Sequence, residues 1–202
     1  MDADPVEIRV LGCLIEKQRT TPDAYPLSLN GLRQACNQAT NRDPVVEYDE
    51  PAIRHALDGL TRRGWARLAS GRGSRAVKYR HLLDEALGLD DAEISLLALL
   101  MLRGPQTPGE LKQRSERLRR FEDLDELDRV LTGLVRRELV VRVSRRPGQK
   151  EDRFAHALGE EPAASADAGN APPDGDRLAA LEQAVAELRE ELAALRSQLA
   201  SR

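Results

Sequence analysis

The chain has 202 residues, of which 41% are apolar and 32% are charged, enough for one large or two small domains. Its 31 Lys and Arg residues are nearly balanced by 34 Asp and Glu residues. The resulting net charge of −3 excludes a uniformly basic protein that coats nucleic acid. Aromatic residues, at 3%, are too few for a base-stacking RNA-binding surface. Neither a membrane span nor a signal peptide is predicted, so we expect a cytoplasmic protein without membrane contact.

The N-terminal part of the chain predicts three helices followed by a β-hairpin. Apolar residues spaced three and four apart predict a first helix around residues 10–15 and a second that begins near Ser28. Pro51, which follows two acidic residues, marks the start of a third helix, and Gly64 ends it. From Trp65 onward, two short strands flank a Gly-rich turn.

The same pattern recurs 74 residues later, which indicates an internal duplication. Gly59–Trp65 aligns with Gly133–Leu139, and after one inserted residue Tyr79–His81 aligns with Phe154–His156. The histidines His81 and His156 therefore fall at equivalent strand ends, and we expect them to pack in the core rather than to act in catalysis.

Earlier in each copy, Thr21-Pro22 corresponds to Thr107-Pro108 at an offset of 86 residues. On this alignment the first copy carries about a dozen extra residues before its third helix. Thr107 and Glu110 form a capping-box pattern, which predicts the start of the second helix of the second copy.

The composition changes after residue 158. Residues 159–176 are rich in Ala, Pro, Gly and Asp, which predicts a flexible linker. Residues 177–202 carry an uninterrupted heptad seam, which favours a parallel coiled coil and a homodimer. The seam consists of Leu178, Leu181, Val185, Leu188, Leu192, Leu195 and Leu199. The alternative is a single amphipathic helix that folds back on its own chain.

Three helices followed by a two-stranded hairpin are the layout of a winged-helix domain. We therefore predict a mainly α fold with small β-hairpins, made of two tandem winged-helix domains plus a C-terminal coiled-coil helix. The predicted boundaries are residues 1–82 and 83–158 for the two domains, 159–176 for the linker and 177–202 for the coiled coil.

Six segments carry a resemblance to a known family, namely Thr21–Asp23, Tyr25–Asn30, Ala35–Gln38, Asn41–Val45, Leu102–Leu111 and Glu116–Leu118. Together they resemble the YceH-like family of uncharacterised bacterial proteins over roughly residues 5–158. The resemblance implies two tandem winged-helix domains, in agreement with the duplication. It carries no catalytic or ligand role over to any residue.

Positive charge is concentrated around the third helix and the hairpin of the first copy. Residues 51–81 hold eight basic residues against one acidic residue, Asp58. In a winged helix these elements commonly meet DNA, the helix at base edges and the hairpin at phosphates. We therefore predict duplex DNA as the partner and a role in transcription regulation, with contacts from Arg54, His55, Arg62, Arg63, Arg72, Arg75 and Lys78. The alternative is a non-enzymatic scaffold whose winged helices bind only proteins, as in chromosome-segregation accessory proteins.

A polar segment between the second and third helices of the first copy has two interpretations. Its Asn and Asp residues are of the kind that cap helices and satisfy backbone groups in loops. In the other interpretation the segment is a binding surface beside the DNA-facing helix, and Asn37 and Arg42 are the candidate residues.

No arrangement of residues predicts catalysis, a cofactor or a metal ion. Cys13 and Cys36 lie on apolar helix faces without metal-ligand spacing and are expected in the core. Gly71–Ser74 lacks the Gly-Lys-Ser/Thr ending of a phosphate-binding loop, and no nucleophile can be tied to a base. We therefore expect a protein that is not an enzyme.

Truncation after Leu158 tests the predicted coiled coil. The shortened chain should keep both winged-helix domains folded, as measured by circular dichroism, and should lose the oligomeric state that the heptad seam contributes. Light scattering that gives the same number of chains per particle with and without the tail would contradict this role.

Overall fold

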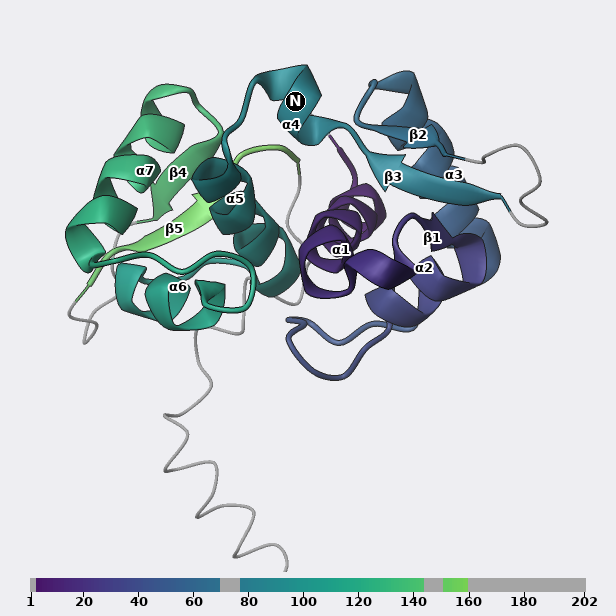
Figure 1. The fold of residues 1–202 in the computed structure, drawn as a ribbon, viewed down its shortest axis with the longest axis horizontal. Helices are drawn as coiled ribbons and strands as arrows, with labels where there is room; N and C mark the ends of the chain where they lie inside the picture. The colour runs from purple at the N-terminus through teal and green to yellow at the C-terminus, as the bar shows by residue number, and fades with distance from the viewer. Residues whose placement is uncertain (1–2, 70–76, 144–150, 160–202) are drawn as a thin grey trace, which may run out of the picture. The chain divides into compact units, whose positions relative to one another are not determined.

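The computed structural model describes residues 3–69, 77–143 and 151–159, all within one compact unit that spans Met1–Ser165. The predicted linker (apart from Gly159) and the predicted coiled coil lie outside the described residues, and they stay predictions. The described part is mainly helical with small antiparallel strand pairs, which confirms that part of the predicted fold class (Figure 1). None of the described helices is long and apolar enough to cross a membrane.

The first half of this unit contains three main helices and a three-stranded sheet. Its elements are α1 (Pro5–Thr20), the 3-10 turn η1 (Pro22–Ala24), β1 (Leu27–Ser28), α2 (Leu29–Cys36), α3 (Glu50–Arg62), β2 (Ala66–Leu68) and β3 (Lys78–His81). The antiparallel strands follow the order β1-β3-β2, with Leu27 opposite Tyr79 and Ala66 opposite His81.

The second half repeats this arrangement after a short connecting helix. Its elements are α4 (Leu83–Leu87), α5 (Asp91–Arg103), α6 (Pro108–Ser115), α7 (Leu124–Arg136), β4 (Val140–Val143) and β5 (Arg153–His156). Strands β4 and β5 are antiparallel, with Val140 opposite His156. A single bridge between Gln106 and Phe154 stands where β1 meets β3 in the first half. The duplication inferred from the sequence is therefore also a duplication of the order of elements.

Local sequence explains where these helices begin and end. The side chains of Asp4, Asp90 and Thr107 each accept a hydrogen bond from the backbone N–H three residues later, where a Glu completes a capping box. At the other end, α3 and α7 are each followed by a residue with positive φ, Gly64 at 73° and Glu138 at 57°. These residues lie 74 positions apart, so the copies share a left-handed turn that glycine adopts with the least strain.

One predicted correspondence between the copies is wrong. Thr107 caps the start of α6, whereas Thr21 precedes only the 3-10 turn η1. The equivalent of Thr107 is Ser28, whose side chain caps α2, so the offset is 79 residues and not 86. Ser28 and Thr107 each follow a residue that pairs with the last strand of their own half, and this pairing sets the alignment.

Helices α1 and α5 lie side by side at the centre of the unit (Figure 1). Nearly every residue of α5 is buried, as its all-round apolar pattern predicts, and α1 is buried from Glu7 to Glu16. A Cβ added to Gly12 of α1 would come within 3.0 Å of the Leu102 side chain, so glycine permits the close approach of the two helices. The two halves therefore share one hydrophobic core.

Trp65 connects the third helix of the first half to its sheet. Trp65 is only 5% exposed, and the Arg63 guanidinium lies 5.7 Å from the centroid of its ring. The Trp65 N–H donates to the Leu60 carbonyl at 2.9 Å, and the Trp65 carbonyl accepts from the Leu82 N–H at 2.7 Å. The residue is thus held by both its backbone and its ring.

Trp65→Ala should lower the free energy of unfolding by about 3–5 kcal/mol, because it removes a large buried ring. Leu68→Ala is the control, since Leu68 is 59% exposed. This second change should cost less than about 0.5 kcal/mol. Urea unfolding followed by circular dichroism measures both variants, and similar losses in the two would contradict the burial of Trp65.

Candidate functional site

Helix α3 presents a polar face away from the core. Its apolar side chains are buried, whereas the predicted contact residues Arg54, His55 and Arg62 are all exposed. Arg63 follows directly after the helix and is exposed as well. Asp58 is the exposed acidic residue within the same stretch. The structure therefore places three of these predicted contact residues on one helix and the fourth directly after its end.

The other three predicted contact residues belong to the hairpin of the first half. Lys78 begins β3, opposite Ser28 of β1, and is half-buried. Arg72 and Arg75 lie outside the described residues, so their place beside α3 stays a prediction.

One further basic residue at this surface was missed by the list of contact residues drawn from the sequence. Arg67 is exposed in the middle of β2 and lies opposite Arg80 of β3. Arg80 is neutralised by Glu85 at 2.5 Å, whereas Arg67 forms no ion pair with any described residue. Its charge could have identified it, because an unpaired cation is seldom buried and Arg67 stands in the same basic stretch as the other contact residues.

Two arginines of this surface have acidic neighbours. Arg54 pairs with Glu50, one turn earlier in α3, at 2.7 Å, and both side chains are more than half exposed. The Nε of Arg63 lies 3.5 Å from the Oε2 of Glu7. Exposed pairs contribute little to stability, so the Arg54 guanidinium can leave Glu50 for another partner at small cost.

Asn37 and Arg42 form internal contacts in the loop between α2 and α3. The Asn37 side-chain amide donates to the Tyr48 carbonyl at 2.8 Å, and its Oδ1 accepts from the Tyr48 N–H at 2.9 Å. The Arg42 side chain is buried, donates to the Ala35 carbonyl at 3.0 Å and reaches both carboxylate oxygens of Glu16, at 3.2 and 2.5 Å. These contacts favour the structural interpretation, because the buried Arg42 is not accessible to a partner.

Glu16 of α1 is the acidic centre of this network. Its side chain is 1% exposed and pairs with Arg42, with Arg117 and, at 3.7 Å, with Lys17. Burial acts to raise the pKa of Glu16, but the hydrogen bonds and charge of Arg42, with the charges of Arg117 and Lys17, lower it below its ordinary value. The carboxylate is therefore ionised inside the protein.

The loop between α2 and α3 also joins the two halves. The Asp43 N–H donates to the Leu102 carbonyl at 2.9 Å, and Arg103 donates to the Oδ1 of Asn41 at 3.1 Å. Arg117 of the second half adds a third contact through the buried carboxylate. The first copy is longer than the second at this loop, and the extra length forms contacts that hold the halves together.

The remaining candidate residues belong to the core. Cys13 and Cys36 are buried, as predicted, and carry free thiols. His81 and His156 are buried at equivalent strand ends, and burial lowers the pKa of each to about 4. Within the described part of the chain, no group of three His, Cys, Asp or Glu side chains could hold a metal ion.

Comparison with known proteins places the chain in a family. Residues 3–149 match the family described as "Protein of unknown function, DUF480". A UPF0502 protein of Geobacter sulfurreducens is 50% identical over 198 residues, which cover 97% of this chain and 88% of that protein. A UPF0502 protein of Serratia proteamaculans is 47% identical over 199 residues, which cover 94% of this chain and 93% of that protein.

The described residues thus define a mainly helical protein whose two similar halves share one core. The chain belongs to the DUF480 family, which includes the bacterial UPF0502 proteins. This membership confirms the YceH-like resemblance of the sequence motifs.

Arg42→Met tests the buried network. It should lower the free energy of unfolding at neutral pH by about 3–5 kcal/mol, because a buried carboxylate loses a closely bound cation. Arg54→Met is the control, since it breaks an exposed pair and should cost less than about 1 kcal/mol. Urea unfolding measures both variants, and equal small losses would show that the network does not stabilise the fold.

The same variant should change the response of stability to acid. Because the folded-state pKa of Glu16 is lowered, its stabilisation is present above the unfolded pKa of about 4.5 and is lost as pH falls through the folded value. Arg42→Met should raise the folded pKa of Glu16 towards its unfolded value, which narrows the gap between the two, so that acidification through this group removes less stability than in the wild type. Urea unfolding at a series of pH values measures how the free energy of unfolding of the variant and of the wild type changes with pH.

Proposed function

We propose that this chain is a cytoplasmic, non-enzymatic DNA-binding protein that acts in transcription regulation, with one winged-helix domain in each half. The order of elements supports the domain assignment, since three helices precede an antiparallel strand pair in both halves. In the first half, β3 lies between β1 and β2, so the short strand before α2 joins the hairpin sheet. In helix-turn-helix proteins the recognition helix lies in the major groove, and α3 is its counterpart here.

The observation that carries this proposal is the difference between the third helices of the two halves. In α3, Arg54 and Arg62 are exposed. In α7, the residues 74 positions later are Asp128 and Arg136. A carboxylate at the place of Arg54 repels the negatively charged duplex, so the first half is the one suited to duplex DNA.

A homodimer is the proposed assembly, with the heptad seam of residues 177–202 as its interface. A dimer would present two α3 faces to one duplex, which is how helix-turn-helix dimers bind paired half-sites. The affinity of each α3 face for a single half-site could then be modest.

Fluorescence anisotropy with labelled duplexes tests the DNA proposal. The affinity of the wild type should fall as salt rises, and each lost phosphate contact should lower the slope of log K against log salt by about 0.9. Arg72→Glu combined with Arg75→Glu should weaken binding to every duplex and flatten this slope. Arg54→Ala or Arg62→Ala should instead alter the preference among sequences by about 1–3 kcal/mol, as expected for a helix at base edges.

Arg136→Ala is the matched control for Arg62→Ala, because it removes the same side chain from the equivalent helix position of the second half. It should leave duplex binding unchanged. A wild type that binds no duplex even at about 50 mM salt, where phosphate contacts are strong, would overturn the proposal. The scaffold that contacts only proteins would then explain the fold better.

A further inference from the structure

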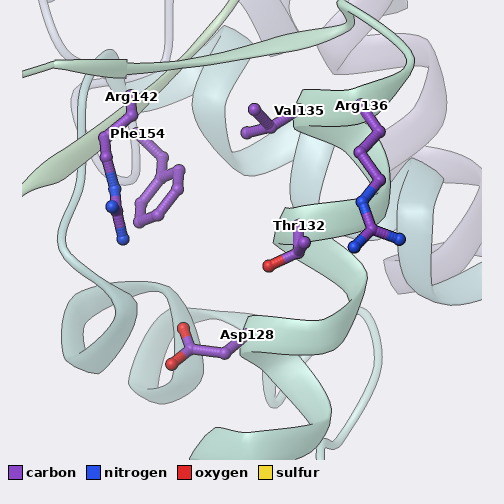
Figure 2. Close-up of a pocket in the computed structure, with 6 residues that line it drawn as sticks. All are labelled: Asp128, Thr132, Val135, Arg136, Arg142 and Phe154. Carbon is purple, nitrogen blue, oxygen red and sulfur yellow. The ribbon is translucent and has the colours of Figure 1, made fainter.

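A groove runs between α7 and the β4–β5 strand pair of the second half (Figure 2). One part is a cavity of about 280 Å³ lined by Asp128, Thr132, Val135, Arg136, Arg142 and Phe154. A neighbouring cavity of about 310 Å³ shares Asp128, Arg142 and Phe154 and extends to Leu124 and Glu151. Because the two cavities share lining residues, they form one continuous groove.

The base of this groove is apolar. Phe154 is 6% exposed, and the Arg142 guanidinium lies 5.5 Å from the centroid of its ring. Val135 is half-buried and extends from α7 toward Phe154 (Figure 2). Leu124, the first residue of α7, is 46% exposed, which is high for a leucine. The groove therefore leaves an apolar strip open to solvent.

Two carboxylates that have no partner among the described residues line the groove beside this strip. Asp128 and Glu151 are exposed and form no hydrogen bond or ion pair within the described residues. Asp152, by contrast, lies 3.4 Å from the Nε of Arg142. The Arg136 side chain extends away from Phe154 in Figure 2. The groove thus combines apolar surface with two carboxylates that pair with no described cation.

The first half differs at the corresponding positions. Arg54 stands in place of Asp128, and Glu50 stands in place of Leu124, each 74 positions earlier. Arg54 and Glu50 pair with each other at 2.7 Å, whereas Asp128 and Leu124 leave a free carboxylate beside an exposed apolar side chain. The duplicated surface has therefore changed in both charge and polarity.

We infer that this groove binds a segment of a partner protein in which an apolar side chain stands next to a lysine or arginine. The apolar side chain rests against Leu124 and Phe154, and the cation meets Asp128 or Glu151. The size of the cavities, at or below that of a typical ligand pocket, suits single side chains better than a whole small molecule. The negative charge disfavours a phosphate backbone and favours a basic segment.

An array of short random peptides, probed with the labelled full-length chain, tests this inference. The wild type should retain peptides with an apolar residue beside Lys or Arg in preference to peptides with Asp or Glu at that place. Asp128→Lys should lower the affinity for the retained peptides about tenfold, because a charge-assisted contact becomes a repulsion. Leu124→Ser should also lower it, through the loss of apolar contact.

Glu116→Lys is the control for Asp128→Lys, because it makes the same charge change at an exposed residue that does not line the groove. It should leave peptide retention unchanged, and circular dichroism should show all the variants folded. Equal losses from Glu116→Lys and Asp128→Lys, or no selection for a basic residue by the wild type, would overturn the site.

The array also carries peptides from residues 177–202 of this chain. Retention of these peptides alone would show that the groove binds its own chain, which would overturn the assignment to a partner protein. The inference does not rest on the proposed DNA-binding function, since the groove lies in the other half. Failure of one proposal is therefore distinguishable from failure of the other. The duplex titration measures DNA binding by α3, whereas the array measures peptide binding at α7.

Discussion

A buried carboxylate holds three parts of this structure together. Glu16 of α1 is paired with Arg42 from the long loop of the first half and with Arg117 from the second half. A charge in a protein interior is costly unless it is paired, so the fully buried Arg42 cannot move away without a large loss of stability. The conformation of the loop and the contact between the halves both depend on this interaction. Helix α3 begins directly after that loop, so its position depends on it as well.

Most elements could be predicted because the signals that set them are local. Pro51 and Gly64 bound α3 closely, since one suits a first turn and the other adopts positive φ. The alignment of the copies failed at Thr21, because a Thr-Pro pair can begin a 3-10 turn as readily as a helix. The correct alignment depends on the pairing of Leu27 with Tyr79, residues far apart in the chain, and one sequence carries no local sign of it.

At the candidate site, too, local signals could be predicted from the sequence and contacts between distant residues could not. The exposed basic face of α3 follows from its own apolar periodicity, so the sequence could place Arg54 and Arg62 outside the core. Arg9 and Glu16, seven residues apart on α1, fall on the polar side of its apolar stripe, yet both are buried. The later loop covers that side, and Arg9 donates to the carbonyl of Pro44 at 2.7 Å. A charged residue is normally placed at the surface, and only its tertiary partners reverse that expectation.

Duplication gave this chain two similar surfaces, and these surfaces now differ in charge. Two copies with the same third helix would compete for the same ligand. On the two proposals, Arg54 in one copy favours a DNA duplex at α3, whereas Asp128 in the other disfavours a phosphate backbone and favours a basic segment at α7. Because α1 and α5 share one core, the two surfaces belong to one compact unit. On the two proposals together, a protein segment bound at α7 is therefore carried to whatever DNA the first half binds.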